Sequence, residues 1–145
     1  MPGTPKMTYK FTNAIVRKPN KSIHNALSSQ YLHPSYEKIL EIHNNYITSI
    51  EDAGLNTILL ESLEQYPDSI FVEDPALIFK NNIIILNPSD FSRNGEAKII
   101  KNEISKYFEK IFIVENGIIE GGDVLNINNH FIIGLSNRTD KLGAE

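Results

Sequence analysis

The stretch EDPALIFKNNIIILNPSDFSRNGEA (residues 73–97) recurs in outline as GGDVLNINNHFIIGLSNRTDKLGAE (residues 121–145). Each copy contains an acid, a short apolar run, an Asn-Asn turn, a second apolar run, and a polar loop with one arginine and a glycine near its end. Two apolar runs joined by asparagines are typical of a β-hairpin. Repetition at about 45–50 residues predicts a modular architecture, whose units bury their faces against one another.

Helices and further strands are predicted around the two copies. Apolar residues at i, i+3, i+4 and i+7 predict a helix over 34–54, with Pro34 in its first turn and Gly54 just past its end. The same spacing predicts a second helix over 96–108. Short β-branched or apolar runs predict strands at 13–17, 56–60, 69–72 and 111–114.

The repeated unit therefore reads as strand, strand, helix, strand. Another strand, loop, helix and strand precede both copies, over residues 13–60. In the second copy the sequence stops where the helix should begin. We therefore expect a flexible leader at 1–12, followed at 13–145 by one α/β domain that is truncated at its C-terminal end. Such a domain needs a partner to cover its open edge, either a second copy in a homo-oligomer or a complementing C-terminal half.

Composition narrows the functional classes. The net charge is −4 and 22% of residues are charged, without a stripe of Lys or Arg, so we expect no nucleic-acid partner. No apolar run approaches the ~20 residues of a membrane span, and the N-terminal residues lack the apolar region of a secretory signal. A cytoplasmic location and no membrane partner are therefore expected. The 145 residues contain no cysteine, so no disulfide or cysteine nucleophile comes from within them.

Three acids bracket a short apolar run in YPDSIFVEDP (66–75): Asp68 before it, then Glu73 and Asp74 after it. One interpretation makes them turn formers and caps, because Asp commonly hydrogen-bonds its own backbone. The other places them around a cationic ligand, because loops at strand ends are where α/β folds bind ligands. The residues alone leave both interpretations open.

The two repeated loops each carry one arginine, Arg93 and Arg138. An arginine pairs with a carboxylate through two hydrogen bonds, and a carboxylate pairs with a guanidinium in the same way. A ligand that carries both groups is arginine or a relative of arginine. The alternative is that both arginines form internal salt bridges with the neighbouring acids.

Glu120 precedes two glycines in IEGGDV (119–124), where it is a candidate to orient a histidine or to bind a cation. A plain turn explains the same residues, because glycines give the backbone freedom there. This stretch is not a phosphate loop, since it has neither GxGxxG nor GxxxxGK. The four histidines show no metal-ligand spacing, so we expect no metal site and assign none of them to catalysis.

In this order and spacing, YPDSIFVEDPAL, SRNGEA, EGGDVL and SNRT resemble the dimethylarginine dimethylaminohydrolase family. That family belongs to the guanidine-modifying penteins, and the resemblance runs from about Asn13 to Glu145. It implies an α/β propeller of the pentein type, of which this sequence would supply about three of five ββαβ units with the last one incomplete. No cofactor is implied.

The resemblance also implies a reaction and a set of roles. In the family, a cysteine thiolate attacks the guanidinium carbon of an Nω-methylated arginine, and a histidine moves protons, which yields citrulline and a methylamine. Matched by position, the resemblance implies that Glu73 and Asp74 face the guanidinium and that Asp68 is a nearby substrate contact. It implies that Arg93 and Arg138 surround the α-carboxylate and that Leu27 is a lid or backbone contact. It also implies that Phe71 supports the wall of the site and that Glu120 orients the histidine.

The sequence departs from the family at the reacting groups. The family's histidine and nucleophilic cysteine belong to its later units, and the 145 residues reach neither. We therefore expect an N-terminal portion of such an enzyme that binds the small-molecule substrate without hydrolysing it by itself. Two other hypotheses stay open: a non-catalytic guanidine-binding remnant or subunit, and a fragment of an arginine-deiminase-like pentein.

Overall fold

The computed structural model describes residues 11–27, 35–93, 95–127 and 130–145. The expected leader lies almost entirely outside these residues, as do Pro34 and the Asn-Asn turn of the second copy. None of the helices in the described part of the chain has the length and hydropathy of a membrane span.

The first unit consists of strand β1 (Asn13–Arg17), helix α1 (Tyr36–Asp52) and strand β2 (Asn56–Leu60), with a short 3-10 helix η1 (Lys21–Asn25) after β1. The two strands pair in parallel, which a helical crossover permits. Ser35 caps α1 by accepting a hydrogen bond from the backbone N–H of Lys38. The strand and helix predictions for this unit are confirmed.

The second unit contains strands β3 (Ala76–Phe79) and β4 (Asn82–Ile85), helix α2 (Glu96–Ile104) and strand β5 (Lys110–Ile113). β3 and β4 form the predicted antiparallel hairpin, and β5 adds in parallel to the other side of β4. The positive φ of the hairpin turn, +56°, falls on Lys80 and not on an asparagine as expected. The helix is also shorter than predicted, because the chain tightens into a 3-10 turn η3 (Ser105–Tyr107).

The third unit contains strands β6 (Val124–Ile127) and β7 (His130–Ile133), again an antiparallel hairpin. A short helix α3 (Lys141–Ala144) follows, so the helical element of this unit begins within the sequence. The side chain of Asp140 caps α3 by accepting the Gly143 N–H at 2.7 Å. Two further 3-10 turns, η2 (Phe91–Arg93) and η4 (Gly121–Asp123), belong to the second and third units.

The strand predicted at 69–72 is wrong, because this segment forms consecutive tight turns. The N–H of Ser69 bonds to the carbonyl of Tyr66, that of Phe71 to Asp68, and that of Asp74 to Phe71, each at 3.0–3.2 Å. These bonds satisfy the backbone locally and leave no ladder for a neighbouring strand. The turns bring the acids of this segment together instead of separating them at two strand ends.

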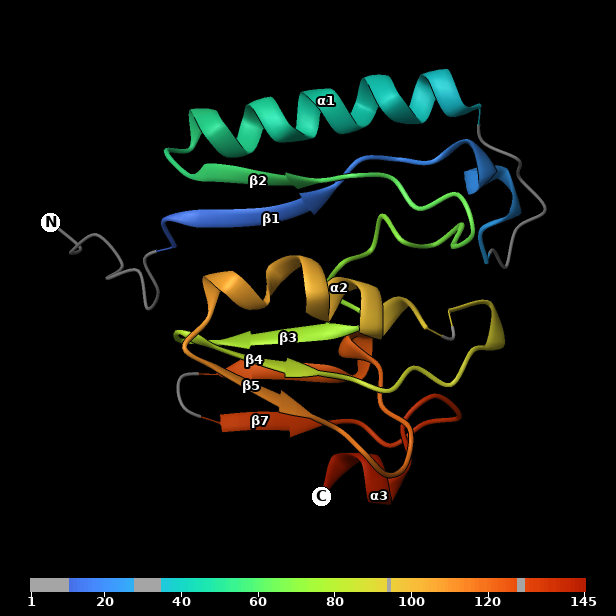
Figure 1. Cartoon of the computed structure of the whole chain (residues 1–145), viewed down its shortest axis with the longest axis vertical. Coiled ribbons are helices and arrows are strands. Elements are labelled where there is room, and N and C mark those ends of the chain that lie inside the picture. The colour runs from blue at the N-terminus through green and yellow to red at the C-terminus, as the bar shows by residue number, and fades with distance from the viewer. Residues whose placement is uncertain (1–10, 28–34, 94, 128–129) are drawn as a thin grey trace, which may run out of the picture.

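The units stack in layers, as Figure 1 shows: α1 covers the β1–β2 sheet, and α2 lies between that sheet and the β3–β4–β5 sheet. The largest core lies around α2 and joins the first two units; its buried members are Leu60, Ala76, Ile83, Ile85, Ile100 and Ile104. The third hairpin packs on the other face of the second sheet, where the rings of Phe79 and Phe131 meet edge to face at 5.5 Å. Neighbouring units thus bury one another's faces, as the repeat predicts.

Candidate functional site

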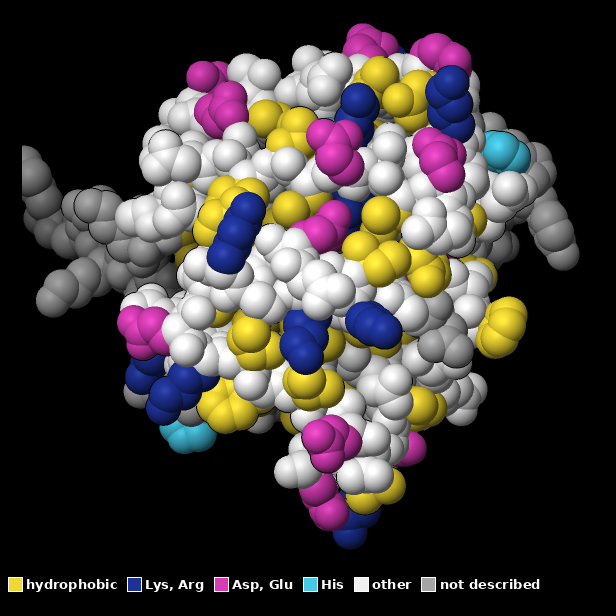
Figure 2. Space-filling model, in the orientation of Figure 1, with side chains coloured by type: hydrophobic (Ala, Val, Ile, Leu, Met, Phe, Trp, Pro, Cys, Tyr) yellow, Lys and Arg dark blue, Asp and Glu magenta, His cyan; other side chains and the backbone are white. Residues whose placement is uncertain are grey.

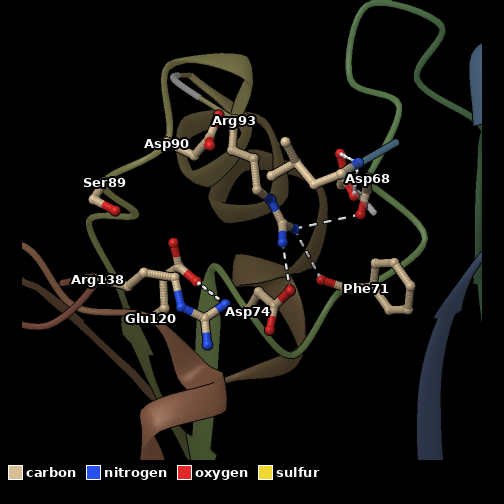
Figure 3. Close-up of a pocket in the computed structure, with 9 residues that line it drawn as sticks. Asp68, Phe71, Asp74, Ser89, Asp90, Arg93, Glu120 and Arg138 are labelled. Carbon is tan, nitrogen blue, oxygen red and sulfur yellow. Dashed lines mark hydrogen bonds and ion pairs between the residues drawn. The ribbon is translucent and has the colours of Figure 1, made fainter. Parts of the chain in front are cut away.

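A pocket of about 270 Å³ opens where the loops of the three units meet. Figure 3 shows its side chains converging from separate elements. Most of these side chains are charged, and acids outnumber arginines. The pocket is lined by Leu27, Asp68, Phe71, Asp74, Ser89, Asp90, Arg93, Glu120 and Arg138.

Two glycines allow the chain to close around this pocket. Gly121 lies so close to the preceding loop that a Cβ there would come within 2.0 Å of the carbonyl oxygen of Glu73, which fixes Glu120 beside Asp74. Gly95 has φ +96°, a left-handed conformation that glycine adopts without strain, and a Cβ there would lie 2.6 Å from the hydroxyl of Tyr66. Both contacts join the pocket loops, at Gly121 through the backbone of Glu73 and at Gly95 through the side chain of Tyr66.

Arg93 is the centre of a buried ion cluster and is only 5% exposed. Its Nη1 donates to Asp74, while its Nε and Nη2 donate to Glu96 at 2.8 and 2.9 Å. Nη2 also donates to the carbonyl of Phe71 at 3.1 Å. These carboxylates raise the pKa of Arg93 above its ordinary value against the opposing effect of burial, so the guanidinium stays charged at every pH that the fold survives.

Arg138 behaves differently, because its side chain is 60% exposed. Its Nη1 lies 3.1 Å from the carboxylate of Glu120, which is itself 5% exposed. A network around Asp123 holds the loop: the carboxylate accepts hydrogen bonds from the hydroxyls of Ser136 and Thr139, both at 2.7 Å. The loop is therefore anchored, while the guanidinium reaches into the open part of the pocket.

Burial raises the pKa of Asp68 and of Glu120 above their ordinary values. Asp68 accepts the backbone N–H of Leu27 at 3.1 and 3.2 Å, which favours its charged form but does not offset its burial. Burial likewise raises the pKa of Glu120 by more than the nearby charge of Arg138 lowers it. Both carboxylates would gain from a further cation in the pocket.

The balance of charge around the pocket is negative. Four lining carboxylates, Asp68, Asp74, Asp90 and Glu120, face two arginines. One of the two arginines, Arg93, also pairs with the buried Glu96, which lies behind the pocket wall and offsets part of its positive charge. A pocket of this kind attracts a cation, and the exposed Arg138 adds one donor group for an anionic end.

The structure brings seven of the eight predicted site residues into one pocket and leaves out Glu73. Glu73 is exposed and lines a neighbouring apolar cavity beside α1. Phe71, 46% exposed, borders both. The alternative of internal salt bridges also describes the structure, because Arg93 pairs with Asp74 and Arg138 with Glu120.

Sequence reasoning missed Ser89, Asp90 and Glu96. Asp90 follows an Asn-Pro-Ser turn signal, and its carboxylate accepts bonds from the N–H and the hydroxyl of Ser92. These bonds hold the pKa of Asp90 below its usual range. Glu96 resembles an ordinary acid in the first turn of a helix, and only its burial reveals the contact with Arg93.

Among the described residues, no cluster of three or more His, Asp or Glu side chains could hold a metal ion.

Stacked α/β units around a charged pocket define an α/β propeller, and comparison with known proteins gives the family. The family model described as "N,N dimethylarginine dimethylhydrolase, eukaryotic" matches residues 10–145. The chain therefore belongs to the dimethylarginine dimethylaminohydrolase family, and the pentein-type fold expected from the sequence is confirmed.

Individual relatives agree with this assignment. The N(G),N(G)-dimethylarginine dimethylaminohydrolase of Pseudomonas aeruginosa is 39% identical over 137 residues, which is 92% of this chain and 54% of that protein. The protein of the same name from Streptomyces coelicolor is 28% identical over 91% of this chain and 52% of its own length. The chain thus spans about half the length of these relatives.

Solved structures extend the comparison. A structure of the Pseudomonas aeruginosa enzyme complexed with citrulline is 38% identical, has a TM-score of 0.89, and is matched over 94% of this chain and 55% of that one. The N-terminal domain of ArgZ, a cyanobacterial arginine dihydrolase, has a TM-score of 0.79 at 15% identity, over 91% of this chain and 51% of that one. The second likeness shows the fold alone.

The pKa shifts predict opposite pH responses for two asparagine variants. Asp68 has a raised pKa, so the folded state binds more protons than the unfolded state above about pH 4, and its charge costs stability as pH rises through the raised pKa. Asp123 has a pKa lowered by Ser136 and Thr139, so its charge adds stability above about pH 4 that is lost on acidification. Asp68→Asn should therefore gain stability relative to wild type from pH 3 to pH 7, and Asp123→Asn should lose it.

Urea unfolding at a series of pH values measures both differences. Asparagine keeps an oxygen that accepts the bonds made to each carboxylate, so the comparison isolates the charge. Parallel pH profiles for the two variants would contradict the assignment.

Proposed function

We propose that this chain forms the substrate-binding part of a dimethylarginine dimethylaminohydrolase, whose complete form hydrolyses Nω-methylated arginines to citrulline and methylamines. One observation carries the proposal most directly: a pocket with four carboxylates against two arginines lies in a chain of this family. Its volume of about 270 Å³ is near the lower end of ordinary small-molecule pockets, which suits a ligand of amino-acid size.

The proposed pose sets the guanidinium against Asp74. That carboxylate is 24% exposed, it already faces Arg93, and it can accept a second charged donor from the pocket side. Asp68 lies across the pocket beside Leu27, where its buried carboxylate is a further contact that favours a cationic ligand. Phe71 forms the wall between them. Glu73 lies outside the pocket lining and has no contact in this pose.

The α-carboxylate of the ligand then lies toward Arg138, the more exposed of the two arginines. Arg93 reaches the same region, but four of its five N–H groups already donate to described residues: those on Nε and Nη2 and one on Nη1. Glu120 is the acid that we assign to orienting a histidine supplied from outside these 145 residues. Its buried carboxylate at the pocket edge supports that role.

A non-catalytic guanidine-binding subunit is the second candidate, and the absence of cysteine from the 145 residues favours it. An arginine-deiminase-like specificity is the third. It differs from the first in the ligand, because it requires unmethylated arginine to bind as tightly as dimethylarginine.

The partner that we infer is a further unit of the same kind. The β6–β7 hairpin exposes Leu125, Ile127 and Ile132 on the face turned away from the second sheet. The equivalent face of the second unit is half-buried, because the third unit covers it through the contact of Phe79 with Phe131. Figure 2 shows hydrophobic side chains reaching the surface among charged ones across the layers. A fourth unit, as in a complementing C-terminal half, would cover the exposed face.

Ligand binding tests the proposed pose. Titration calorimetry should show dimethylarginine binding to the wild-type chain, and Arg138→Gln should weaken that binding by roughly tenfold or more because a charge-assisted bidentate contact is lost. Lys141→Gln is the matched control, since Lys141 has the same charge, lies three residues away and pairs with Glu145 outside the pocket. Equal affinities in wild type and Arg138→Gln would contradict the pose, and equal binding of arginine would favour the deiminase-like specificity.

Turnover tests the claim that the reacting groups lie outside this sequence. The purified chain, incubated with dimethylarginine, should release citrulline no faster than a blank without protein, because a cysteine thiolate is needed for the attack. Citrulline release above the blank, in a preparation shown by mass spectrometry to contain this chain alone, would overturn the claim.

Association of the isolated chain tests the exposed hairpin face. Exposed apolar strands promote self-association, so sedimentation should show oligomers that increase with protein concentration. Leu125→Lys combined with Ile132→Lys should shift the chain to monomer, whereas Leu142→Lys, an equally exposed leucine on α3, should not. A wild-type chain that stays monomeric at all concentrations would refute the proposal that this face binds a further unit.

A further inference from the structure

Glu96 is the first residue of α2 and has a side chain only 1% exposed. Its Oε2 accepts from Arg93 Nε at 2.8 Å and its Oε1 accepts from Arg93 Nη2 at 2.9 Å, a two-pronged contact. It does not line the pocket. A buried carboxylate that meets the back of a pocket arginine in this way controls where that arginine points.

We propose that Glu96 is a positioning residue for the cation pocket, an inference that rests on the function proposed above. Glu96 holds the far edge of the Arg93 guanidinium, so that Nη1 is directed at Asp74. It also neutralises the charge of Arg93, which leaves the carboxylate of Asp74 able to attract a second cation from the ligand.

The third unit shows what the loop does without this glutamate. Arg138 corresponds to Arg93 in the repeat, and the residue three positions later is Lys141 instead of an acid. Arg138 is 60% exposed and pairs with Glu120, whereas Arg93 is 5% exposed. The same loop thus gives a fixed arginine where a glutamate follows and an exposed arginine where a lysine follows.

The shape of the Arg93 guanidinium explains how its contact with Glu96, here called the clamp, affects the ligand. Glu96 occupies the Nε edge and part of Nη2, and the carbonyl of Phe71 takes another hydrogen of Nη2. The group is planar and rigid, so fixing one edge fixes the direction of Nη1. Figure 3 shows Arg93 directed from its helix toward Asp74.

The chain contains a matched control for this contact. Glu103 lies on the same helix and makes the same kind of contact with Arg17, at 3.1 and 2.6 Å, but neither residue lines the pocket. Glu96→Gln and Glu103→Gln therefore each remove one carboxylate charge from a two-pronged contact with a buried arginine, although Glu103 is the more exposed of the two glutamates. Only Glu96→Gln should alter the pocket.

Two readouts separate positioning from a general structural role. By calorimetry, Glu96→Gln should weaken dimethylarginine, a cation, by roughly tenfold while the affinity for citrulline, whose side chain is neutral, changes little. Glu96→Asp keeps the charge and should retain more of the cation preference than Glu96→Gln does. In NMR spectra of the arginine side chains, Glu96→Gln should shift the Nε–H signal of Arg93, whereas Glu103→Gln should leave that signal unchanged.

Each outcome decides the proposal. An equal loss of affinity for both ligands in Glu96→Gln, or the same ligand preference in all three variants, would overturn it. If the wild-type chain binds neither ligand, the proposed function fails and the NMR experiment alone tests the clamp. An Arg93 signal unchanged in Glu96→Gln would then refute the clamp, and a shifted signal in a folded variant would support it.

Discussion

The buried guanidinium of Arg93 is the interaction on which the site depends. It joins the turn that carries Asp68 and Asp74 to the start of α2, where Glu96 lies. Removing one partner of such a buried pair typically costs about 3–5 kcal/mol, because an uncompensated charge remains in the interior. The pocket geometry is therefore coupled to the docking of α2, and it is not a property of the loops alone.

Helix α2 links this site to the rest of the fold. At its C-terminal end, Glu103 pairs with Arg17 of β1, whose guanidinium also donates to the carbonyl of Glu61 at 2.7 Å. The apolar face of the helix fills the space between two sheets. Because α2 is held by an ion pair at each end and by the core between them, it fixes the position of the second unit against the first. In this position the backbone N–H of Leu27, in the first unit, donates to Asp68.

The repeat also explains how one loop serves two purposes. Asp74 and Asp123 occupy equivalent places, yet Asp74 accepts an arginine and Asp123 accepts the hydroxyls of Ser136 and Thr139. In the second unit the pair forms part of the pocket. In the third unit the acid anchors the loop and leaves its arginine exposed at the pocket.

Much of the fold could be predicted because its signals are local. Both hairpins show paired apolar runs around asparagines, and α1 has a cap and a long apolar periodicity. The strand prediction at 69–72 is wrong because three consecutive apolar residues resemble a strand. Nothing in the local sequence shows that the backbone there forms hydrogen bonds within its own turns. The family resemblance predicted seven of the residues that line the pocket. It could not reveal Glu96, because a first-turn glutamate is ordinary in sequence and only the packing of α2 against Arg93 buries it.

The proposed function requires the carboxylates of this pocket to bind the guanidinium end of an arginine derivative. A crystal structure of the chain grown with dimethylarginine tests it most directly. The proposed pose should give density in the pocket with the guanidinium against Asp74 and the α-carboxylate toward Arg138. Ligand density in the apolar cavity beside α1, or with the carboxylate against Asp74, would contradict it.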